Sequence, residues 1–447
     1  MTLLDIFPSL RSAMSPRLDP AVWPINTHHD EHGRITVGGV ALSDIADQYG
    51  TPSYVIDELD VRHRCRTYRE IFPEAEIAYA GKALMTRALA SWVSQEGLAL
   101  DVCSAGELAI ALSAGVDARR IIMHGNAKTP AELTAALDAG VGRIVIDSHT
   151  EIVVLGSTLD HKQDVLVRVT PDIDVHGHRA VRTGVADQKF GFPIEHGQAD
   201  AAIKRVLDQP HLNLIGLHCH LGSQITDPEH FGAAVHRMIA QMTQVYHDHG
   251  LILTELNLGG GHAVSYGFDD MPLDLTQLAS TIEDALDEAC ARHRFPRPRI
   301  TLEPGRAIVA RSGVTVYRVV SVKHIEGGRT FVCVDGGMSD NPRVCLYAAR
   351  YSVALANRHP VGAQVPVTVA GRHCESGDEL AVDVHLTADV RPGDVLAIPG
   401  TGAYHHGLAS NYNSVARPPI IAVCNGSARE LIRRETIDDL LRRESSL

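Results

Sequence analysis

Reactive side chains recur along the first two-thirds of the chain, and each stands at or just after the end of a short apolar run. The set comprises Lys82, Asp101, His124, Asn126, Arg168, His218, His220, Ser223, Glu303 and Arg306. Taken singly, each has an ordinary explanation, such as a solvated lysine or a strand-end ion pair. Barrel enzymes, however, place their reacting groups where parallel strands end and loops begin. The recurrence therefore predicts that these side chains meet at one site.

Two motifs within this set carry specific chemistry. Gly259-Gly260-Gly261 leaves backbone N–H groups uncovered, which suits a phosphate, although alone it could equally be a flexible turn. His218 and His220 stand two apart on a predicted strand, so they point to the same side and could bind a metal. No third ligand follows at a characteristic spacing. We therefore favour a histidine that stacks on a flat ring over a metal ligand.

A lysine at a strand end, a glycine-based phosphate site, a stacking histidine and a carboxylate beside an arginine together meet the requirements of pyridoxal phosphate. The lysine forms the Schiff base, and the histidine covers one face of the ring. The carboxylate keeps the pyridine nitrogen protonated, so that the ring can accept electrons. The residues thus predict pyridoxal phosphate as the cofactor and no bound metal.

Eight strand candidates, separated by longer segments with helical spacing, must position these residues. They are IAYAGK (77–82), LALDVCS (98–104), RIIMHGN (120–126), RIVIDS (143–148), DVLVRVT (164–170), LIGLHCHLG (214–222), ELNLGGG (255–261) and RITLEPGR (299–306). Strands that alternate with helices pair in parallel, and eight units in about 230 residues is the number that closes a (β/α)8 barrel. An open doubly wound sheet is the structural alternative.

The connecting segments carry helix start and stop signals. Thr129-Pro130 is typical of an N-cap followed by proline in the first turn. Glycines stand where helices should end, at Gly97, Gly115, Gly140 and Gly250. The segment 229–250 has an apolar stripe at three- and four-residue spacing, which we assign to the core: Phe231, Ala234, Met238, Met242 and Val245.

The chain changes character after Arg306. Runs such as VTVYRVVSV, TFVCVDGG and DVLAIPG, separated by Gly, Pro and Asp, predict a second, antiparallel β domain. The N-terminal phrase GRITVGGVALS is also strand-like and could join it. We expect an N-terminal segment over 1–45 that joins the β domain, the barrel over 46–310 and the β domain over 311–447.

Composition excludes several classes of protein. The 447 residues are 45% hydrophobic and 21% charged, as in globular proteins. A net charge of −13 without a basic run argues against nucleic-acid binding. The eight cysteines form no C-x-x-C pair, which favours free thiols in a reducing cytoplasm. We expect neither export nor membrane insertion, because no apolar stretch reaches about 18 residues.

Nine short motifs follow one another along the chain: Tyr79-Ala-Gly-Lys82, Asp101-Val-Cys-Ser-Ala-Gly-Glu107, His124-Gly-Asn126, His220-Leu-Gly-Ser223-Gln, Gly259-Gly-Gly261, Glu303-Pro-Gly-Arg306, Asp335-Gly-Gly-Met-Ser-Asp340, His373-Cys-Glu-Ser-Gly-Asp378 and Thr401-Gly-Ala-Tyr404. With these motifs in order, the chain resembles diaminopimelate decarboxylases over about nine-tenths of its length. That family belongs to the alanine-racemase-like (fold-type III) class of pyridoxal phosphate enzymes, with ornithine and arginine decarboxylases.

The resemblance implies roles around the cofactor. Lys82 would form the Schiff base, His220 would stack on the ring and Glu303 would pair with the pyridine nitrogen. Asp101 and Glu107 would lie around the lysine and orient it. The phosphate would be held by Ser223, Gly259, Gly260, Gly261, Gly305, the backbone at Arg306 and the hydroxyl of Tyr404.

It also implies roles toward the substrate. Cys374 would return the proton to the carbon that loses carbon dioxide, and Glu375 would bind the distal ammonium. The distal carboxylate end would be bound by Arg306, Arg343 and Tyr347, with Tyr404 nearby. In this family the Cys374-Glu375 pair reaches into the barrel of the neighbouring subunit, so the resemblance implies a homodimer with shared active sites.

The implied reaction is decarboxylation of meso-2,6-diaminopimelate to L-lysine, the last step of lysine biosynthesis. Ornithine and lysine lack a distal carboxylate, and a pocket with both Arg306 and Arg343 would be wasted on them. A paralogue that acts on a related amino acid, in a secondary-metabolite or siderophore pathway, is the main alternative. A racemase, a non-catalytic homologue and a metal-dependent barrel hydrolase are the other classes that we consider.

Three segments depart from the family pattern: His176-Gly-His-Arg179, His262-Ala263 after the triple glycine, and His405-His406-Gly407 after Tyr404. We expect all three near the rim of the cofactor site. There they would leave the cofactor apparatus unchanged but could reshape the substrate cavity.

Overall fold

The computed structural model describes residues 17–175, 184, 187–267 and 270–445. The chain divides into two compact units. One comprises residues 62–263 and 271–308. The other comprises the segments up to 61, 264–270 and from 309 onward. Each unit is described by itself below.

The first unit is a closed barrel of eight parallel strands. They are β5 (Glu76–Ala80), β6 (Ala99–Val102), β7 (Ile121–Met123), β8 (Arg143–Ile146), β9 (Gln163–Thr170), β11 (Leu212–His218), β12 (Glu255–Asn257) and β13 (Arg299–Leu302). They follow the order β9-β11-β12-β13-β5-β6-β7-β8, and β8 pairs with β9 to complete the ring. A short strand, β10 (Phe192–Pro193), adds to β9. The closure confirms the predicted (β/α)8 barrel and excludes the open sheet.

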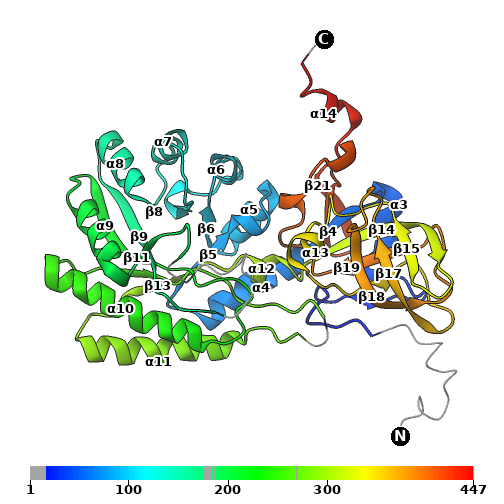
Figure 1. The fold of residues 1–447 in the computed structure, drawn as a ribbon, viewed down its shortest axis with the longest axis horizontal. Coiled ribbons are helices and arrows are strands. Elements are labelled where there is room, and N and C mark those ends of the chain that lie inside the picture. Colours follow the sequence, from blue (N-terminus) through cyan, green and yellow to red (C-terminus); the bar gives the residue numbers. More distant parts are fainter. Residues whose placement is uncertain (1–16, 176–183, 185–186, 268–269, 446–447) are drawn as a thin grey trace, which may run out of the picture. The chain divides into compact units, whose positions relative to one another are not determined.

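The helices of this unit lie around the strands (Figure 1). They are α4 (Glu58–Ile71), α5 (Arg87–Gln95), α6 (Ala105–Ser113), α7 (Pro130–Ala139), α8 (His149–Thr158), α9 (Gln198–Leu207), α10 (Glu229–His249), α11 (Leu275–His293) and α12 (Arg306–Val309). Short 3-10 turns are η1 (Gly81–Ala83), η2 (Ala118–Arg120) and η4 (Glu195–Gly197). No helix in the described part of the chain combines the length and the apolar character that a membrane span needs.

Local signals account for the helix ends and for the buried faces. Thr129 caps α7 in a reciprocal capping box with Glu132, Pro130 occupies the first turn, and Gly140 ends the helix at φ 70°. The predicted stripe of α10, from Phe231 to Val245, is buried. Small and branched residues from five successive strands fill the barrel interior: Ala78, Ala99, Ile122, Val145 and Leu166.

An ion network lies where three barrel strands begin. The guanidinium of Arg143, the first residue of β8, donates to both carboxylate oxygens of Glu76, at 2.5 and 2.9 Å. It also donates to Oε1 of Glu255 at 2.7 Å. Burial alone would raise the pKa of Glu76, but the hydrogen bonds and charge of Arg143 lower it overall. The network pairs charges at the amino ends of the strands, away from the ends where the reactive residues stand.

The second unit is built on a sheet in the order β18-β17-β15-β14-β4-β20-β21. Its strands are β4 (Ser53–Asp57), β14 (Gly313–His324), β15 (Thr330–Val334), β16 (Ala354–Leu355), β17 (Gln364–Ala370), β18 (Glu379–Thr387), β19 (Val395–Pro399), β20 (Ile420–Cys424) and β21 (Ser427–Ile432). Strand β19 pairs with β14 and β16. Most pairs are antiparallel, as predicted. Two are parallel, β15 with β17 and β4 with β20, because long connections bring these strands back in the same direction.

Residues before the barrel contribute to the β unit. The phrase GRITVGGVALS folds as β2 (Ile35–Val37), β3 (Val40–Ala41) and the start of α3 (Leu42–Tyr49), and β1 (His28–His29) pairs with β2. Strand β4 also belongs here, because it pairs with β14 and β20. The β unit therefore extends to residue 61, past the boundary that we expected at residue 45.

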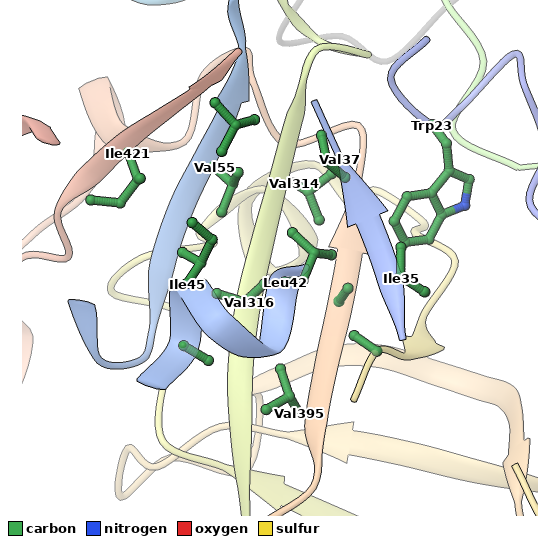
Figure 2. Close-up of a cluster of buried hydrophobic side chains, with 14 of the residues drawn as sticks. Trp23, Ile35, Val37, Leu42, Ile45, Val55, Val314, Val316, Val395 and Ile421 are labelled. Atoms are coloured by element: carbon green, nitrogen blue, oxygen red, sulfur yellow. The ribbon is translucent and has the colours of Figure 1, made fainter. Parts of the chain in front are cut away.

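The N-terminal segment is held by an apolar core. Figure 2 shows Leu42 and Ile45 of α3 packed over Val55 of β4 and over Val314 and Val316 of β14. These side chains are at most 1% exposed, so the segment is integral to the unit. The unit also contains α13 (Arg343–Tyr347), α14 (Ile437–Leu441), η5 (His406–Leu408) and η6 (Tyr412–Ser414).

Candidate active site

The reactive residues of the barrel converge at the carboxyl ends of its strands. Lys82 lies in η1, directly after β5, and is exposed. Its charge helps to lower the pKa of His220, and it also acts to lower the pKa values of Asp101 and His124. Asp101, at the end of β6, is 3% exposed, and burial raises its pKa to about 6 against the opposing charges of His124 and Lys82. The lysine thus lies among the groups predicted to accompany it.

Glu303 is the centre of a buried hydrogen-bond cluster. Its Oε1 accepts from Asn257 Nδ2 at 2.7 Å and lies 2.8 Å from His124 Nε2, and its Oε2 lies 3.3 Å from His218 Nε2. Burial would raise the pKa of Glu303, but the charge of His124 and the hydrogen bonds from both histidines hold it well below its usual value. The cluster keeps a carboxylate ionised at the end of β13. We did not single out Asn257 from the sequence, where its only signal is its place at the end of the seventh strand run.

The pKa values of the two histidines are shifted in opposite directions. Burial lowers the pKa of His218 to about 3, so its ring is neutral. Burial would also lower the pKa of His124, but Asp101 and Glu303 raise it above its ordinary value. Ligand atoms of His124, His218 and Glu303 lie within 4.8 Å of one another, a spacing that a metal ion could use. Hydrogen bonds from ring nitrogens to the carboxylate account for the same spacing.

His220 does not join His218 in a ligand pair. Its Nδ1 accepts from the backbone N–H of Gly260 at 3.1 Å, and its pKa is lowered by burial and by nearby cations. The imidazole is therefore neutral and anchored to the glycine segment. This arrangement fits a ring that stacks on a flat group, as the sequence predicts.

The glycine segment needs glycine for steric reasons. Gly259 and Gly261 have φ of 66° and 102°. A Cβ at Gly260 would lie 2.1 Å from the carbonyl oxygen of Glu303, and one at Gly261 would lie 2.2 Å from that of Gly222. The segment thus packs against the loops that follow β11 and β13.

The other predicted phosphate residues adjoin these loops. Arg306 donates to Ser223 Oγ at 3.0 Å, which joins the start of α12 to the loop after β11. A Cβ at Gly305 would lie 3.0 Å from the carbonyl oxygen of Ala80, two residues before Lys82. An ionised carboxylate, a glycine segment, a serine, an arginine and a lysine are therefore collected at one end of the barrel. This donor set fits pyridoxal phosphate.

Two predicted residues have local roles that are visible in the barrel. Glu107 accepts from the backbone N–H of Cys103 at 2.8 Å, and its own N–H donates to Ser104 Oγ, which caps α6. Arg168 lies 3.4 Å from Asp147 Oδ2 and 4.4 Å from the Phe190 ring centroid. These contacts match the ordinary strand-end ion pair that we considered for Arg168.

In the β unit, one loop presents Cys374 and Glu375. The carboxylate of Asp378 accepts from the backbone N–H groups of Met338 and His373, at 2.6 and 2.7 Å. The His373 ring also lies 2.8 Å from Ser339 Oγ. This bonding holds the loop, and both Cys374 and Glu375 are exposed on it. A hydrogen bond to Glu375 raises the pKa of Tyr412.

Arg343 is a buried cation in the same unit. It is 6% exposed, and its guanidinium lies 5.0 Å from the Tyr266 ring centroid and 5.8 Å from that of Tyr351. It donates a hydrogen bond to the Tyr351 hydroxyl. Among the residues that the structure describes, no carboxylate forms an ion pair with it. A buried guanidinium without a carboxylate is suited to an anionic ligand.

The two remaining predicted residues of the β unit are partly accessible. Tyr347, in α13, and Tyr404 are both half-buried. Tyr404 has a φ of 61°, which is uncommon for a residue with a side chain and accompanies functional loops.

The departures from the family pattern have different surroundings. His176 to Arg179 lie outside the described residues. His262 directly follows the glycine segment, and its side chain is 2% exposed and packs against Tyr68 and Phe231.

The histidines after Tyr404 belong to the β unit. His405 is 1% exposed and contacts the edge of Tyr351, the tyrosine that binds Arg343. Burial lowers the pKa of His406 to about 4, and its ring lies against Tyr54. His405 is thus part of the packing behind Arg343.

Comparison with known proteins gives consistent matches. Residues 58–310 match the family model for the pyridoxal-dependent decarboxylases, pyridoxal binding domain. The chain is 53% identical over 99% of its length to a diaminopimelate decarboxylase of Actinosynnema pretiosum subsp. auranticum, which it covers completely. It is 41% identical over 93% of its length to that of Bacillus subtilis, covering 96% of that protein. A crystal structure of the diaminopimelate decarboxylase from M. jannaschii with L-lysine superposes at a TM-score of 0.88, with 30% identity and coverage of 94% and 98% of the two chains.

Proposed function

The chain belongs to the diaminopimelate decarboxylase family, and on this basis we propose that it removes one carboxylate from meso-2,6-diaminopimelate to give carbon dioxide and L-lysine. It is a pyridoxal-dependent carboxy-lyase of lysine biosynthesis. The observation that carries the proposal is the ionised Glu303, held between His124 and His218 at the end of the barrel that also bears Lys82.

The barrel residues would bind and orient pyridoxal phosphate, which when bound supplies a ring that accepts the electron pair left by departing carbon dioxide. Glu303 holds negative charge where the ring nitrogen would need a proton. Lys82 would supply the amine for covalent attachment, and His220 would cover one face of the ring. The phosphate would be bound by Ser223, Gly259, Gly260, Gly261, Gly305, Arg306 and, from the β unit, Tyr404.

The β unit would supply the proton that replaces the lost carboxylate. Cys374 stands exposed on the loop held by Asp378, and its thiol can donate a proton to carbon. Glu375, next to it, is suited to the distal ammonium of the substrate. A serine at position 374 would keep the size of the side chain but not its acidity.

Arg343 would bind the distal carboxylate, together with Arg306 and Tyr347. Its support is the buried guanidinium that has no carboxylate partner among the described residues. Lysine and ornithine would leave that charge uncompensated, at a cost of several kcal/mol. Diaminopimelate is therefore favoured over both. The alternative of a paralogue acting on a related amino acid is disfavoured, because the relatives that match nearly the full chain are diaminopimelate decarboxylases.

We propose that the protein works as a homodimer whose active sites combine the barrel of one subunit with the Cys374 loop of the other. Mixing Lys82→Ala and Cys374→Ala subunits after partial denaturation and refolding tests this. Random pairing would restore about a quarter of the wild-type activity, since half of the dimers would hold one intact site. Activity that stays at the level of the separate variants would refute the shared site.

A substrate panel tests the reaction itself. The purified protein is incubated with pyridoxal phosphate and, separately, meso-diaminopimelate, lysine, ornithine and arginine. Carbon dioxide release and formation of lysine from the first substrate alone are the expected results. Loss of optical activity of L-lysine, L-ornithine or L-arginine without release of carbon dioxide would indicate a racemase. No reaction with any of the four substrates would overturn the proposed function. Metal analysis of the active preparation tests the alternative of a metal-dependent hydrolase, which would require a stoichiometric metal ion.

A further inference from the structure

Helix α4 contacts the segments on both sides of the proposed phosphate site. The Arg64 guanidinium donates to the carbonyl oxygen of Ala307, which follows Gly305 and Arg306, at 2.9 Å. One turn further, a hydrogen bond of 2.7 Å joins the Tyr68 hydroxyl to Nδ1 of His262, the residue after Gly261. Residues four apart share one face of a helix, so a single face of α4 holds both segments.

The Tyr68–His262 pair is buried among aromatic rings. Tyr68 is fully buried and His262 is 2% exposed. The two rings are nearly parallel, at 14° and 5.6 Å between centroids, and Phe231 of α10 contacts the imidazole at 5.3 Å. Burial lowers the pKa of His262 to about 3, so the ring is neutral and the hydrogen bond joins two uncharged groups.

His262 is a costly residue for packing alone. Its Nε2 is buried without a hydrogen-bond partner among the described residues. An apolar side chain would fill such a place without burying an unpaired nitrogen. Its hydrogen bond to Tyr68 is therefore the feature of His262 that an apolar side chain could not supply.

The position of His262 determines the path of the glycine segment. It forms a parallel bridge with Ile225, whose N–H donates to the carbonyl oxygen of Gly261 at 2.9 Å. The N–H of Ala263 donates back to Ile225 at 3.1 Å. A side chain tied to α4 at residue 262 therefore sets where Gly261 meets the loop that carries Ser223.

We propose that Tyr68 and His262 are positioning residues, whose hydrogen bond anchors the glycine segment to α4 and shapes it for the phosphate of the cofactor. This role rests on the proposed function. It concerns the phosphate end first, because the bridge between His262 and Ile225 acts on Gly261, whereas the ring end would be held by Glu303 and its partners.

The test compares cofactors with and without a phosphate. Apo-protein of the wild type, of Tyr68→Phe, of His262→Leu and of the double variant is titrated with pyridoxal phosphate and with pyridoxal, and dissociation constants are measured by absorbance. Each single variant should weaken pyridoxal phosphate binding about three- to tenfold, as expected for one buried hydrogen bond, and leave pyridoxal binding unchanged. The double variant should have the same dissociation constant as the single variant that binds pyridoxal phosphate less tightly, because both changes remove the same hydrogen bond.

Tyr246→Phe is the matched control. Tyr246 lies on α10 of the same unit and is 44% exposed, so loss of its hydroxyl should leave both dissociation constants unchanged. Tyr68→Phe keeps the buried ring, and it carries the test if His262→Leu does not fold.

Dissociation constants within twofold of wild type in both single variants would overturn the role. Equal weakening for pyridoxal and pyridoxal phosphate would also overturn it, since the pair would then support the barrel in general. Failure of the wild-type protein to bind pyridoxal phosphate at all would instead refute the proposed function.

Discussion

The Nε2 atom of His124 lies 2.8 Å from Oε1 of Glu303, and both side chains are buried. The contact ties two strands on different sides of the barrel ring, since His124 follows β7 and Glu303 follows β13. Each group also favours the charged form of the other, the imidazolium of His124 and the carboxylate of Glu303. The pKa of the histidine is raised, and that of the carboxyl is held low.

This pair predicts a pH-dependent contribution to stability. A histidine whose pKa is raised by folding stabilises the protein fully below its unfolded pKa of about 6.5, and less as the pH rises through its folded value. The free-energy difference between the wild type and His124→Gln should therefore be largest near pH 6 and smaller at about pH 9. Urea unfolding of the apo-proteins at both pH values measures it. A difference that grows with pH would contradict the charged state assigned to His124.

Glu303→Gln should separate attachment of the cofactor from its use. The amide is neutral, so it no longer stabilises a proton on the ring nitrogen, and turnover should fall by at least about 100-fold. Borohydride reduction followed by peptide mass spectrometry should still find the cofactor on Lys82. Wild-type turnover in this variant would remove Glu303 from its role.

Lys82→Ala should abolish the yellow absorbance of the protein incubated with pyridoxal phosphate, because no other described residue of the cluster offers an amine there. The spectrum of the dialysed variant is compared with that of the wild type. Lys128→Met is not a suitable control, since Lys128 is buried against Glu151 at 2.5 Å. Lys189→Met is the control, because Lys189 contacts only the Phe190 ring among the described rings. The Lys189→Met protein should keep its yellow absorbance. An unchanged spectrum in Lys82→Ala would refute the attachment.

Cys374→Ala should slow turnover by about two to four orders of magnitude, the usual contribution of a positioned proton donor. The dissociation constant for pyridoxal phosphate should not change, because the thiol acts on the substrate. Cys290→Ala removes a partly exposed thiol on α11 of the barrel and serves as the control. Full activity in Cys374→Ala would mean that a different group returns the proton.

Arg143→Met should destabilise the barrel by about 1–3 kcal/mol, because Glu255, which is 2% exposed, loses its buried cation and keeps only the half-exposed Arg299 as a partner. Denaturant unfolding of the apo-protein measures the loss. The protein that remains folded should keep the wild-type KM, since the network lies at the amino ends of the strands. A change in KM without a change in stability would contradict this separation.

The barrel could be predicted from the sequence because its signals are local. A short apolar run followed by a helical segment recurs eight times, most of these runs end in a reactive residue, and five of the described barrel helices carry their own N-caps. The positions of Lys82, Asp101, His220 and Glu303 at the strand ends could be predicted for the same reason, since each stands at a fixed place within one repeat.

The remaining features depend on partners that are distant in the sequence. Asn257 reads as an ordinary strand residue until β13 brings Glu303 to it. His262 reads as a substrate-cavity residue until α4, almost two hundred residues earlier in the chain, supplies Tyr68. The parallel pairing of β4 with β20 joins segments from the two ends of the chain, and no short-range pattern encodes it.

The charges around Arg143 divide the labour within the barrel. Folding draws on ion pairs at one mouth of the cylinder, and catalysis draws on groups at the other. Substitutions that change the preferred substrate can therefore accumulate at the carboxyl ends of the strands without weakening the ion pairs at the amino ends. The same barrel could in this way acquire a new specificity and stay folded.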